Sequence, residues 1–324
     1  MKFGVYVLFE NPEWMPPLRR ELKRAEIHFE EWFINKGHFD LSDVPPEGVF
    51  LNRISPSSHT RDHTESINFT REMLIWLESN GRRVINGSHA FSLEISKVRQ
   101  YQALREVGLR TPHTIVVSSD PDELKKAAIS MPLPFLTKHN CGGKGLGIRL
   151  FHSLEEFDEH IGTSDYQKPV DSILLLQEYI ESPDPYITRV EMVGEKFLYA
   201  INSNTSQGFE LCPAEGCDTN NTTDELHENV EEKGRDRQNL FSLREDFFDP
   251  IIDKYKEYMR KFSVDIAGFE FIETSSGEKI TYDVNGTTNY SPSVEERHGL
   301  NGMAAIAELI SRELKAASQD TKNN

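Results

Sequence analysis

The chain has 324 residues, too many for one typical hydrophobic core, so we expect two or three domains. Its formal net charge is −17, with 36 Lys and Arg against 53 Asp and Glu. A field of that sign repels phosphate backbones, which argues against a nucleic-acid partner. No apolar run approaches the roughly 18 residues of a membrane span, so we expect no membrane partner.

The first residues and the cysteines indicate a cytoplasmic protein. The apolar run near the start is short and lacks a small-residue cleavage site, so it predicts a strand and not a signal peptide. Cys141, Cys212 and Cys217 are an odd and sparse set, which indicates reduced thiols. No second Cys/His pair accompanies the C-x4-C of Cys212 and Cys217, so loop cysteines are favoured over a metal site.

Residues 1–112 are expected to form a parallel α/β unit, because predicted strands and helices alternate along them. Short apolar runs predict strands at 3–9, 48–54 and 82–87. Helical spacing of apolar residues predicts helices at 16–34, 67–81 and 92–109.

Two further units follow, at residues 113–185 and 186–316, with a flexible tail at 317–324. The central unit is predicted to contain strands at 110–118, 134–139, 147–152 and 172–180, and helices at 119–129 and 153–161. The third unit is predicted to contain hairpins at 186–204 and 265–286, and helices at 248–263 and 302–318. Residues 214–236 hold eight Asp/Glu against two Lys/Arg, which predicts a mobile surface loop, here called the acidic loop.

A glycine-rich loop, "GGKGLG" at 142–147, separates two strands of the central unit. Glycines let backbone N–H groups approach a ligand and form an anion nest, and nearby lysines add positive charge. The pattern is not a P-loop and does not open a helix as a dinucleotide fingerprint would. Taken alone, it is more typical of an ordinary glycine hairpin than of a polyphosphate site.

The last hairpin carries oxygen-bearing side chains on one face. Asp283 and Asn285 are two residues apart, so they point to the same side of their strand, and Glu270 can lie opposite them. Carboxylate and amide oxygens are the ligands that Mg²⁺ prefers, so these three residues predict a metal site. The alternative is an exposed polar strand face, which is common in antiparallel sheets.

These motifs together resemble those of an ATP-grasp ligase of the glutathione synthetase and ribosomal-protein glutamate ligase (RimK-like) type. The resemblance is ordered and spans roughly residues 49–311. It rests on six segments: "VFLNRISPSS", "VINGSHAFSLEISKVRQYQALREVGLRTPHT", "FLTKHNCGGKGLGIRLF", "LLQEYI", "TRVEMVGEKFLYAI" and "AGFEFIETSSGEKITYDVNG". The resemblance implies an α/β protein with the ATP-grasp fold, preceded by a parallel pre-ATP-grasp domain at 1–112.

The resemblance also implies the chemistry. A carboxylate attacks the γ-phosphate of ATP, and an amine displaces phosphate from the resulting acyl phosphate, giving an amide, ADP and phosphate. Mg²⁺ would assist, with Mn²⁺ as an alternative. The substrates would be amino acids or short peptides, and a homo-oligomer is compatible with the resemblance.

Site residues follow from the same resemblance. Lys97 and Lys138 would neutralise the phosphates, although spacing alone favours a solvated helix lysine at Lys97. Arg189 would act with Lys138 in catalysis. The other implied residues are the lid (Gly142, Gly143, Lys144, Gly145, Gly147), the adenosine contacts (Gln177, Glu178, Tyr179, Ile180), the metal ligands (Glu270, Asp283, Asn285) and the substrate side (Arg53, Asn202, Ser203).

The chain departs from the family pattern at several positions. Ile187 stands where an Asp is usual, Ser203 stands where an arginine often contacts the transferred phosphate, and "NGTTN" from Asn285 replaces "N..PG". These differences favour a divergent substrate, and the acidic loop suggests a cationic one. Two alternatives stay open: an ATP-grasp small-molecule kinase, and a non-catalytic ATP-binding regulatory protein.

Overall fold

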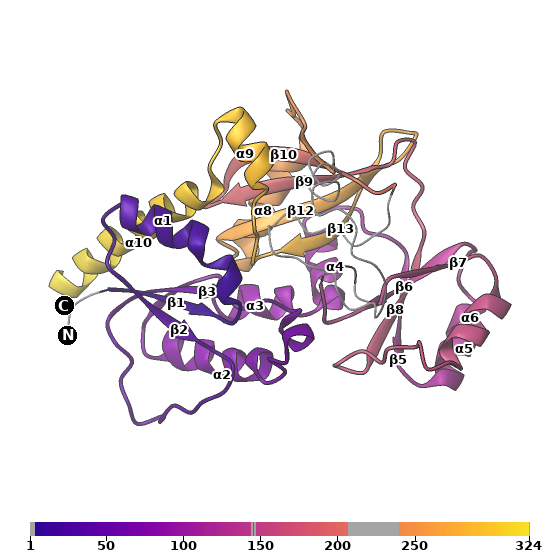
Figure 1. The fold of residues 1–324 in the computed structure, drawn as a ribbon, viewed down its shortest axis with the longest axis horizontal. Helices are drawn as coiled ribbons and strands as arrows, with labels where there is room; N and C mark the ends of the chain where they lie inside the picture. Colours follow the sequence, from indigo (N-terminus) through magenta and orange to yellow (C-terminus); the bar gives the residue numbers. More distant parts are fainter. Residues whose placement is uncertain (1–3, 144, 146, 207–239, 324) are drawn as a thin grey trace, which may run out of the picture.

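A computed structural model of the chain describes residues 4–143, 145, 147–206 and 240–323. Three β-sheets and the helices that cover them make up the described chain (Figure 1). The predicted acidic loop, Cys212 and Cys217 lie outside the described residues. No helix among the described residues combines the length and apolar character needed to cross a membrane.

The N-terminal sheet is parallel, with strand order β2-β1-β3-β4. It consists of β1 Gly4–Phe9, β2 Phe29–Phe33, β3 Gly48–Arg53 and β4 Arg83–Ile85, with helices α1 Pro16–Arg24 and α2 Ser66–Ser79. The central strands β1 and β3 are buried along their whole length, as expected for parallel strands covered on both faces. Their carboxyl ends, where ligands usually bind in open α/β sheets, point to the loops after Phe9 and Arg53.

The helix predicted over 16–34 is wrong in its second half. α1 ends at Arg24, the chain turns at Glu26 with φ 55°, and residues from Phe29 onward form β2. β2 pairs with β1 over its five residues, and this pairing outweighs the local helical spacing.

The helix predicted over 92–109 is divided into two. α3 Ser88–Glu94 ends before Ser96, which adopts an extended conformation and caps α4 Lys97–Glu106 by accepting a hydrogen bond from the Arg99 amide. The break places Glu94 at the end of one helix and Lys97 at the start of the next.

The central sheet is antiparallel, with strand order β5-β8-β6-β7. It consists of β5 Thr114–Ser118, β6 Phe135–His139, β7 Arg149–Phe151 and β8 Ile173–Glu178, with helices α5 Pro121–Ala128 and α6 Leu154–Ile161. Its buried core is drawn entirely from residues 117–176 and includes three mutually packed phenylalanines, Phe135, Phe151 and Phe157. In Figure 1 this unit lies to one side of the other two sheets.

The C-terminal sheet has five antiparallel strands in the order β11-β10-β9-β12-β13. It consists of β9 Tyr186–Val193, β10 Lys196–Asn204, β11 Phe241–Leu243, β12 Ile266–Glu273 and β13 Lys279–Asn285, with helices α8 Ile251–Phe262, α9 Pro292–His298 and α10 Gly302–Asn323. α10 continues helical to Asn323, through most of the segment that we expected to be a frayed tail.

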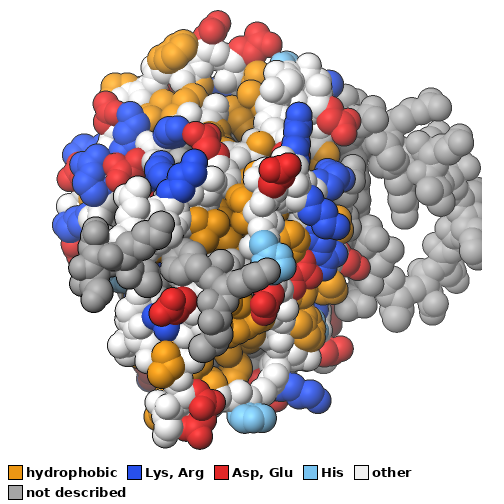
Figure 2. All heavy atoms as spheres, turned by 90° about the vertical axis from the view of Figure 1, so that its left-hand side faces the viewer, with side chains coloured by type: hydrophobic (Ala, Val, Ile, Leu, Met, Phe, Trp, Pro, Cys, Tyr) orange, Lys and Arg blue, Asp and Glu red, His pale blue; other side chains and the backbone are white. Residues whose placement is uncertain are grey.

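The two faces of the C-terminal sheet bury different neighbours. One face packs on α4 and α8, in a core that includes Leu104, Tyr255 and Phe269. The other face shares a core with the N-terminal sheet and α10, where Val7, Ile201 and Ile306 meet. The N-terminal and C-terminal sheets are therefore joined by a common core. On the face shown in Figure 2, basic and acidic side chains lie intermingled around apolar ones, so the excess of acidic residues does not form one patch there.

Asn86 joins these two sheets through hydrogen bonds made by a single side chain. Its Nδ2 donates to the carbonyls of Ile266 (2.9 Å) and Gly286 (3.0 Å), and its Oδ1 accepts from the amides of Asp265 (2.8 Å) and Ile266 (3.0 Å). Asn86 is buried, with φ 51°, a conformation that asparagine tolerates better than most residues.

We expect Asn86→Ala to destabilise the protein by about 3 kcal/mol, because it leaves four buried backbone groups without partners. Urea unfolding measures the loss. The matched control is Asn80→Ala, which removes one side-chain hydrogen bond, to the Trp76 carbonyl at 2.9 Å, and should cost about 1 kcal/mol or less. Equal losses for the two variants would contradict the role of Asn86.

Candidate functional site

A cleft of about 520 Å³ opens between the central and C-terminal sheets, and loops of the N-terminal unit line one part of it. Most residues that we expected from the sequence to bind ATP or metal line this cleft. They are Lys97, Lys138, Gly142, Gly143, Gly145, Gln177, Glu178, Tyr179, Ile180, Arg189, Glu270, Asp283 and Asn285. The fold thus brings together segments that are far apart in the sequence.

Two buried lysines share one carboxylate in the cleft. Lys97, the first residue of α4, bonds Asp283 Oδ1 through its Nζ. Lys138 of β6 places its Nζ 3.8 Å from Asp283 Oδ2 and donates to the Tyr282 carbonyl at 3.2 Å. Lys97 is only 3% exposed and Lys138 only 6%, so Lys97 is not a solvated helix lysine. Buried ammonium groups need such partners, because burial of an unpaired charge is costly.

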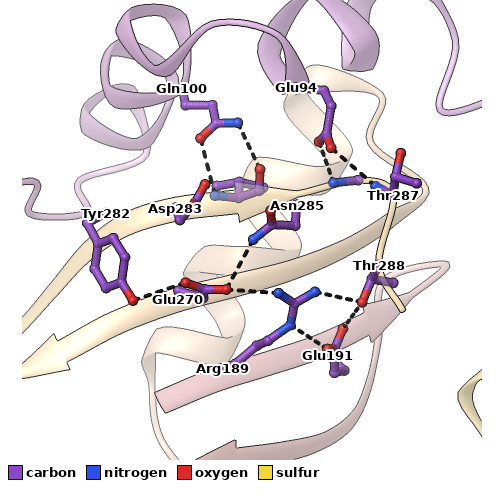
Figure 3. Close-up of polar contacts among 12 residues, drawn as sticks. Glu94, Gln100, Arg189, Glu191, Glu270, Tyr282, Asp283, Asn285, Thr287 and Thr288 are labelled. Carbon is purple, nitrogen blue, oxygen red and sulfur yellow. Dashed lines mark hydrogen bonds and ion pairs between the residues drawn. The ribbon is translucent and has the colours of Figure 1, made fainter. Parts of the chain in front are cut away.

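Arg189 of β9 forms a second charged network, which Figure 3 shows. Its guanidinium donates to Glu191 (2.6 Å), Glu270 (2.8 Å) and the Thr288 hydroxyl (2.7 Å). Burial by itself would lower the pKa of Arg189, but Glu191 and Glu270 outweigh burial and raise it. Arg189 therefore stays charged and holds Glu270 in place.

Glu270 and Asp283 are directly opposite each other in the β12–β13 ladder, as the sequence predicts. Asn285 Nδ2 donates to Glu270 Oε1 at 3.2 Å (Figure 3). Burial and repulsion from Asp283 raise the pKa of Glu270. Burial also acts to raise the pKa of Asp283, but Lys97 and Lys138 outweigh it and the net pKa is lowered.

Tyr282 lines the same wall because a β-bulge interrupts the ladder. Glu270 pairs with Asp283 but Phe271 pairs with Thr281, so Tyr282 is the extra residue. Its hydroxyl donates to Glu270 Oε2 at 3.0 Å, and the Lys138 ammonium lies 5.1 Å from its ring centroid. Strict alternation would point Tyr282 away from Asp283, so the sequence pattern did not indicate it.

The donor set of Glu270, Asp283 and Asn285 fits Mg²⁺ in a specific way. Within the described ranges no group of three or more His, Cys, Asp or Glu could hold a metal by itself. Mg²⁺, however, usually takes one or two protein carboxylates and completes its octahedron with waters and phosphate oxygens. Because Asp283 is shared with two lysines, the set suits a cation that arrives with a polyphosphate, whose oxygens can accept the lysine N–H groups.

The predicted adenosine contacts lie at and after the end of β8. Glu178 Oε1 accepts a hydrogen bond from the His113 amide at 2.6 Å. Gln177 is turned into the protein, where its Nε2 donates to the Tyr101 hydroxyl at 2.7 Å, so its side-chain amide is already engaged. Apolar side chains line the cleft as well and would suit a planar ring: Leu136, Ile148 and Ile272.

The glycine-rich loop borders the cleft through Gly142, Gly143 and Gly145. Gly147 does not line the cleft, but its φ is 72°, and a Cβ there would lie 2.1 Å from the His139 ring, so only glycine fits. Lys144, predicted to contact ATP, lies outside the described residues.

The residues expected on the substrate side do not line the cleft. Arg53 is buried behind Asn289, to whose Oδ1 it donates at 2.8 Å, and burial lowers its pKa to about 10. Asn202 Oδ1 accepts a hydrogen bond from the Thr188 hydroxyl at 3.1 Å, and Ser203 is buried in β10. The structure leaves these two side chains within the C-terminal sheet.

Glu94 is a cleft residue for which no sequence motif gave a signal. Its carboxylate accepts hydrogen bonds from the amides of Gly286 and Thr287, directly after β13. Burial raises its pKa to about 6, although these two hydrogen bonds act in the opposite direction. Asn289 is a second such residue, from the irregular segment between β13 and α9.

No family model matches the chain, and no curated protein matches it. Solved structures do resemble it. The ATP-grasp ligase PsnB complexed with a minimal precursor is 13% identical and has a TM-score of 0.62, with 97% of this chain and 100% of that chain covered. A RimK-domain ATP-grasp protein from Sphaerobacter thermophilus is 13% identical, with a TM-score of 0.64 and coverage of 94% and 98%. D-cycloserine synthetase DcsG is 16% identical, with a TM-score of 0.62 and coverage of 95% and 99%.

The chain has the ATP-grasp fold. The predicted fold class is thereby confirmed. In this ATP-grasp structure the cleft described above lies between the central and C-terminal sheets, with Lys97, Lys138, Arg189 and the two opposed carboxylates inside it.

We expect Arg189→Met to destabilise the protein by about 3–5 kcal/mol, because it leaves Glu191 and Glu270 as unpaired buried carboxylates. The free energy of unfolding in urea gives the measurement. Arg260→Met is the matched control: Arg260 pairs with Glu195 at the surface, and its loss should cost about 0.5 kcal/mol. If Arg189→Met destabilised the protein no more than Arg260→Met does, the ion pairs of Arg189 would contribute little to stability.

We expect Glu94→Gln to change how stability depends on pH. The folded-state pKa of Glu94, about 6, lies above the ordinary value of 4.5 for a glutamate side chain. Protonated Glu94 therefore stabilises the folded wild-type protein. This stabilisation is fully present below pH 4.5 and is lost as the pH rises through about 6. Gln keeps an acceptor oxygen for the two amides but does not titrate. As the pH rises across that window, the free energy of unfolding of the variant should increase by about 2 kcal/mol relative to that of wild type. Urea unfolding at a series of pH values measures this difference. A difference in unfolding free energy between variant and wild type that does not change with pH would contradict the raised pKa of Glu94.

Proposed function

We propose that this protein is an ATP-dependent carboxylate–amine ligase that forms an amide or peptide bond. The observation that carries the proposal is the convergence of Lys97 and Lys138 on Asp283, opposite Glu270, in one cleft of an ATP-grasp fold. Two buried ammonium groups beside two partly buried carboxylates suit a ligand that is itself a metal–polyphosphate pair.

Binding of such a ligand would be an exchange of ion partners. The phosphate oxygens would accept the N–H groups of Lys97 and Lys138, and the cation would take the place of these ammonium groups at Asp283, with Glu270 as a further ligand. Little further desolvation of protein charge is needed, because both lysines are already buried and both carboxylates are already partly buried. Arg189 and Tyr282 would keep Glu270 oriented during the exchange.

Glu270, Asp283 and Asn285 are the residues that would hold Mg²⁺, or Mn²⁺ as an alternative. When bound, the ion would neutralise charge on the phosphates and orient the transferred group. Solved structures of this fold include PsnB with Mg and ADP and PsnB with AMPPNP, which supports a magnesium nucleotide here.

The reaction would proceed in two steps. A carboxylate oxygen of the first substrate attacks the γ-phosphorus, the bond to the β–γ bridging oxygen breaks, and ADP leaves. An amine nitrogen then attacks the acyl carbon, loses its proton, and the C–O bond breaks with phosphate as leaving group. Lys138 and Arg189 would act by holding and neutralising negative charge near the transferred group.

The acyl phosphate would have to be shielded from water. We propose that the glycine-rich loop, with Lys144, closes over the phosphates as a lid. The separate core of the central unit supports our division of the chain into an N-terminal unit at 1–112, a central unit at 113–185 and a C-terminal unit at 186–316.

The substrates are proposed to be amino acids or short peptides. Several ATP-grasp ligases of the same overall structure have been solved with precursor peptides, including PsnB and the macrocyclase MdnC from Microcystis aeruginosa. Hydroxyl and amide side chains line the part of the cleft next to the N-terminal unit: Ser55, Ser57, Thr287 and Asn289. A cationic amine substrate stays a hypothesis, since the acidic loop on which it rests is outside the described residues.

The test is ATP turnover with Mg²⁺, a pool of amino-acid and peptide carboxylates, and hydroxylamine as the amine. We expect ADP together with a hydroxamate, which reports an activated acyl group. We expect Lys138→Ala to reduce turnover by about 100-fold, because a charge aimed at the transferred phosphate is lost. Lys126→Ala, which removes an exposed lysine from α5, is the matched control and should keep full activity.

Other products would contradict the ligase. ADP with a phosphorylated product and no hydroxamate would indicate a kinase. ATP binding that depends on Lys138, with no turnover of any pool member, would favour a regulatory nucleotide-binding protein.

A further inference from the structure

One end of the cleft is formed by the segment that follows β13, residues 286–290. Asn289 of this segment lines the cleft, and its Oδ1 accepts a hydrogen bond from Arg53 Nη2 at 2.8 Å. Arg53 is the last residue of β3, at the carboxyl edge of the N-terminal sheet. The pair therefore joins the N-terminal unit to the strand that carries Asp283 and Asn285.

The contact with Arg53 determines which end of the Asn289 amide faces the cleft. A guanidinium has only donors, so it can pair with the amide oxygen and not with the amide nitrogen. The oxygen of Asn289 is thus directed at Arg53, and its Nδ2 keeps two N–H donors. Within the described part of the chain, Nδ2 has no hydrogen-bond partner. The cleft wall at Asn289 is consequently a donor surface with a cation behind it.

Arg53 differs from the other buried arginine of the site in its charge balance. Arg189 has two carboxylate partners, whereas Arg53 has none among the described residues. Arg53 is 4% exposed, so its charge is screened little by water. A buried cation without a counter-ion favours an anion nearby, and the cleft next to Asn289 is the adjacent open space.

We propose that Asn289, oriented by Arg53, recognises the substrate carboxylate that is to be activated, and so selects a free carboxylate over a neutral amide. This inference rests on the proposed ligase function. Asn289 is the specificity-determining residue and Arg53 is a positioning residue that acts through it. Ser55 and Ser57, whose hydroxyls are 2.8 Å apart, line the same end and add polar partners.

The location supports a role with the reacting group. Asn289 directly follows Thr288, whose hydroxyl accepts a hydrogen bond from Arg189 at 2.7 Å, and Arg189 also holds Glu270. Asn285 and Asn289 both line the cleft, so we infer that a group held by Asn289 lies near the residues proposed to hold Mg²⁺. The segment from Asn285 to Asn289 is also where the sequence departs from the family pattern "N..PG", with Asn289 at the place of the final glycine. The N–H donors of the Asn289 side chain are therefore a feature of this chain and not of the family pattern.

The direct test is NMR of the protein labelled with ¹⁵N at asparagine, with AMPPNP and Mg²⁺ present, titrated with acetate and separately with acetamide. The Asn289 side-chain signals are assigned by their absence in Asn289→Asp. We expect saturable shifts with acetate and at least about tenfold weaker binding of acetamide, since a hydrogen bond to a charged group contributes about 1.5–3 kcal/mol. No shift with acetate, or equal shifts with both probes, would overturn the proposal.

Two variants separate recognition from folding. Asn289→Asp can still accept from Arg53 but presents an anion in place of two donors, so it should abolish acetate binding. Arg53→Met leaves no charge unpaired, so the protein should stay folded, but the Asn289 amide becomes free to rotate and the preference for acetate over acetamide should fall. If both variants still bound acetate more tightly than acetamide, the proposal would be contradicted.

Asn301→Asp is the matched control. Asn301 is exposed, its Oδ1 accepts from the Ala304 amide at 2.8 Å, and an aspartate there keeps this bond while adding the same charge outside the cleft. ATP turnover by the same proteins separates the role of Asn289 from the proposed ligase function. Hydroxamate formed equally well by wild type and Asn289→Asp contradicts this inference alone, whereas no hydroxamate from a wild-type protein that binds AMPPNP contradicts the ligase function.

Discussion

The shared carboxylate of Asp283 is the interaction on which the rest of this structure depends. Lys97 comes from α4, Lys138 from the central sheet and Asp283 from the C-terminal sheet, so one ionic contact joins three parts of the chain. None of these groups would be stable alone at such low exposure. Together with Arg189, Glu191 and Glu270 they make three cations and three carboxylates, whose charges balance one another.

This balance is what would allow a protein with a net charge of −17 to hold a polyphosphate at the proposed site. The positive charge is local, buried and held in position by neighbours, so the long-range field matters less at the site than the immediate partners. Each of these charges has a partner within the protein, which a ligand could replace. Pre-arranged charges of this kind need little rearrangement when a nucleotide binds.

Much of the fold was predictable because its signals are local. Alternating strands and helices indicated the parallel N-terminal sheet, and the last hairpin placed Glu270 opposite Asp283, since cross-strand register follows from the turn. The errors have local causes too. Residues 29–33 form β2 although their spacing is helical, because an open edge of β1 was available for pairing. Tyr282 was missed because a bulge, which sequence periodicity does not reveal, turns it into the cleft.

The sequence by itself determined the fold class, the succession of elements and the chemical types at the site: lysines, opposed carboxylates and a glycine-rich loop. Only the tertiary structure decided which of these groups meet and how each is partnered. It buried Lys97, turned Gln177 into the protein and left Asn202 and Ser203 out of the cleft. It also brought Arg53 and Asn289 together across 236 residues of sequence. The physical reason is that side-chain type and spacing are encoded locally, whereas burial, charge pairing and amide orientation depend on neighbours supplied by distant segments.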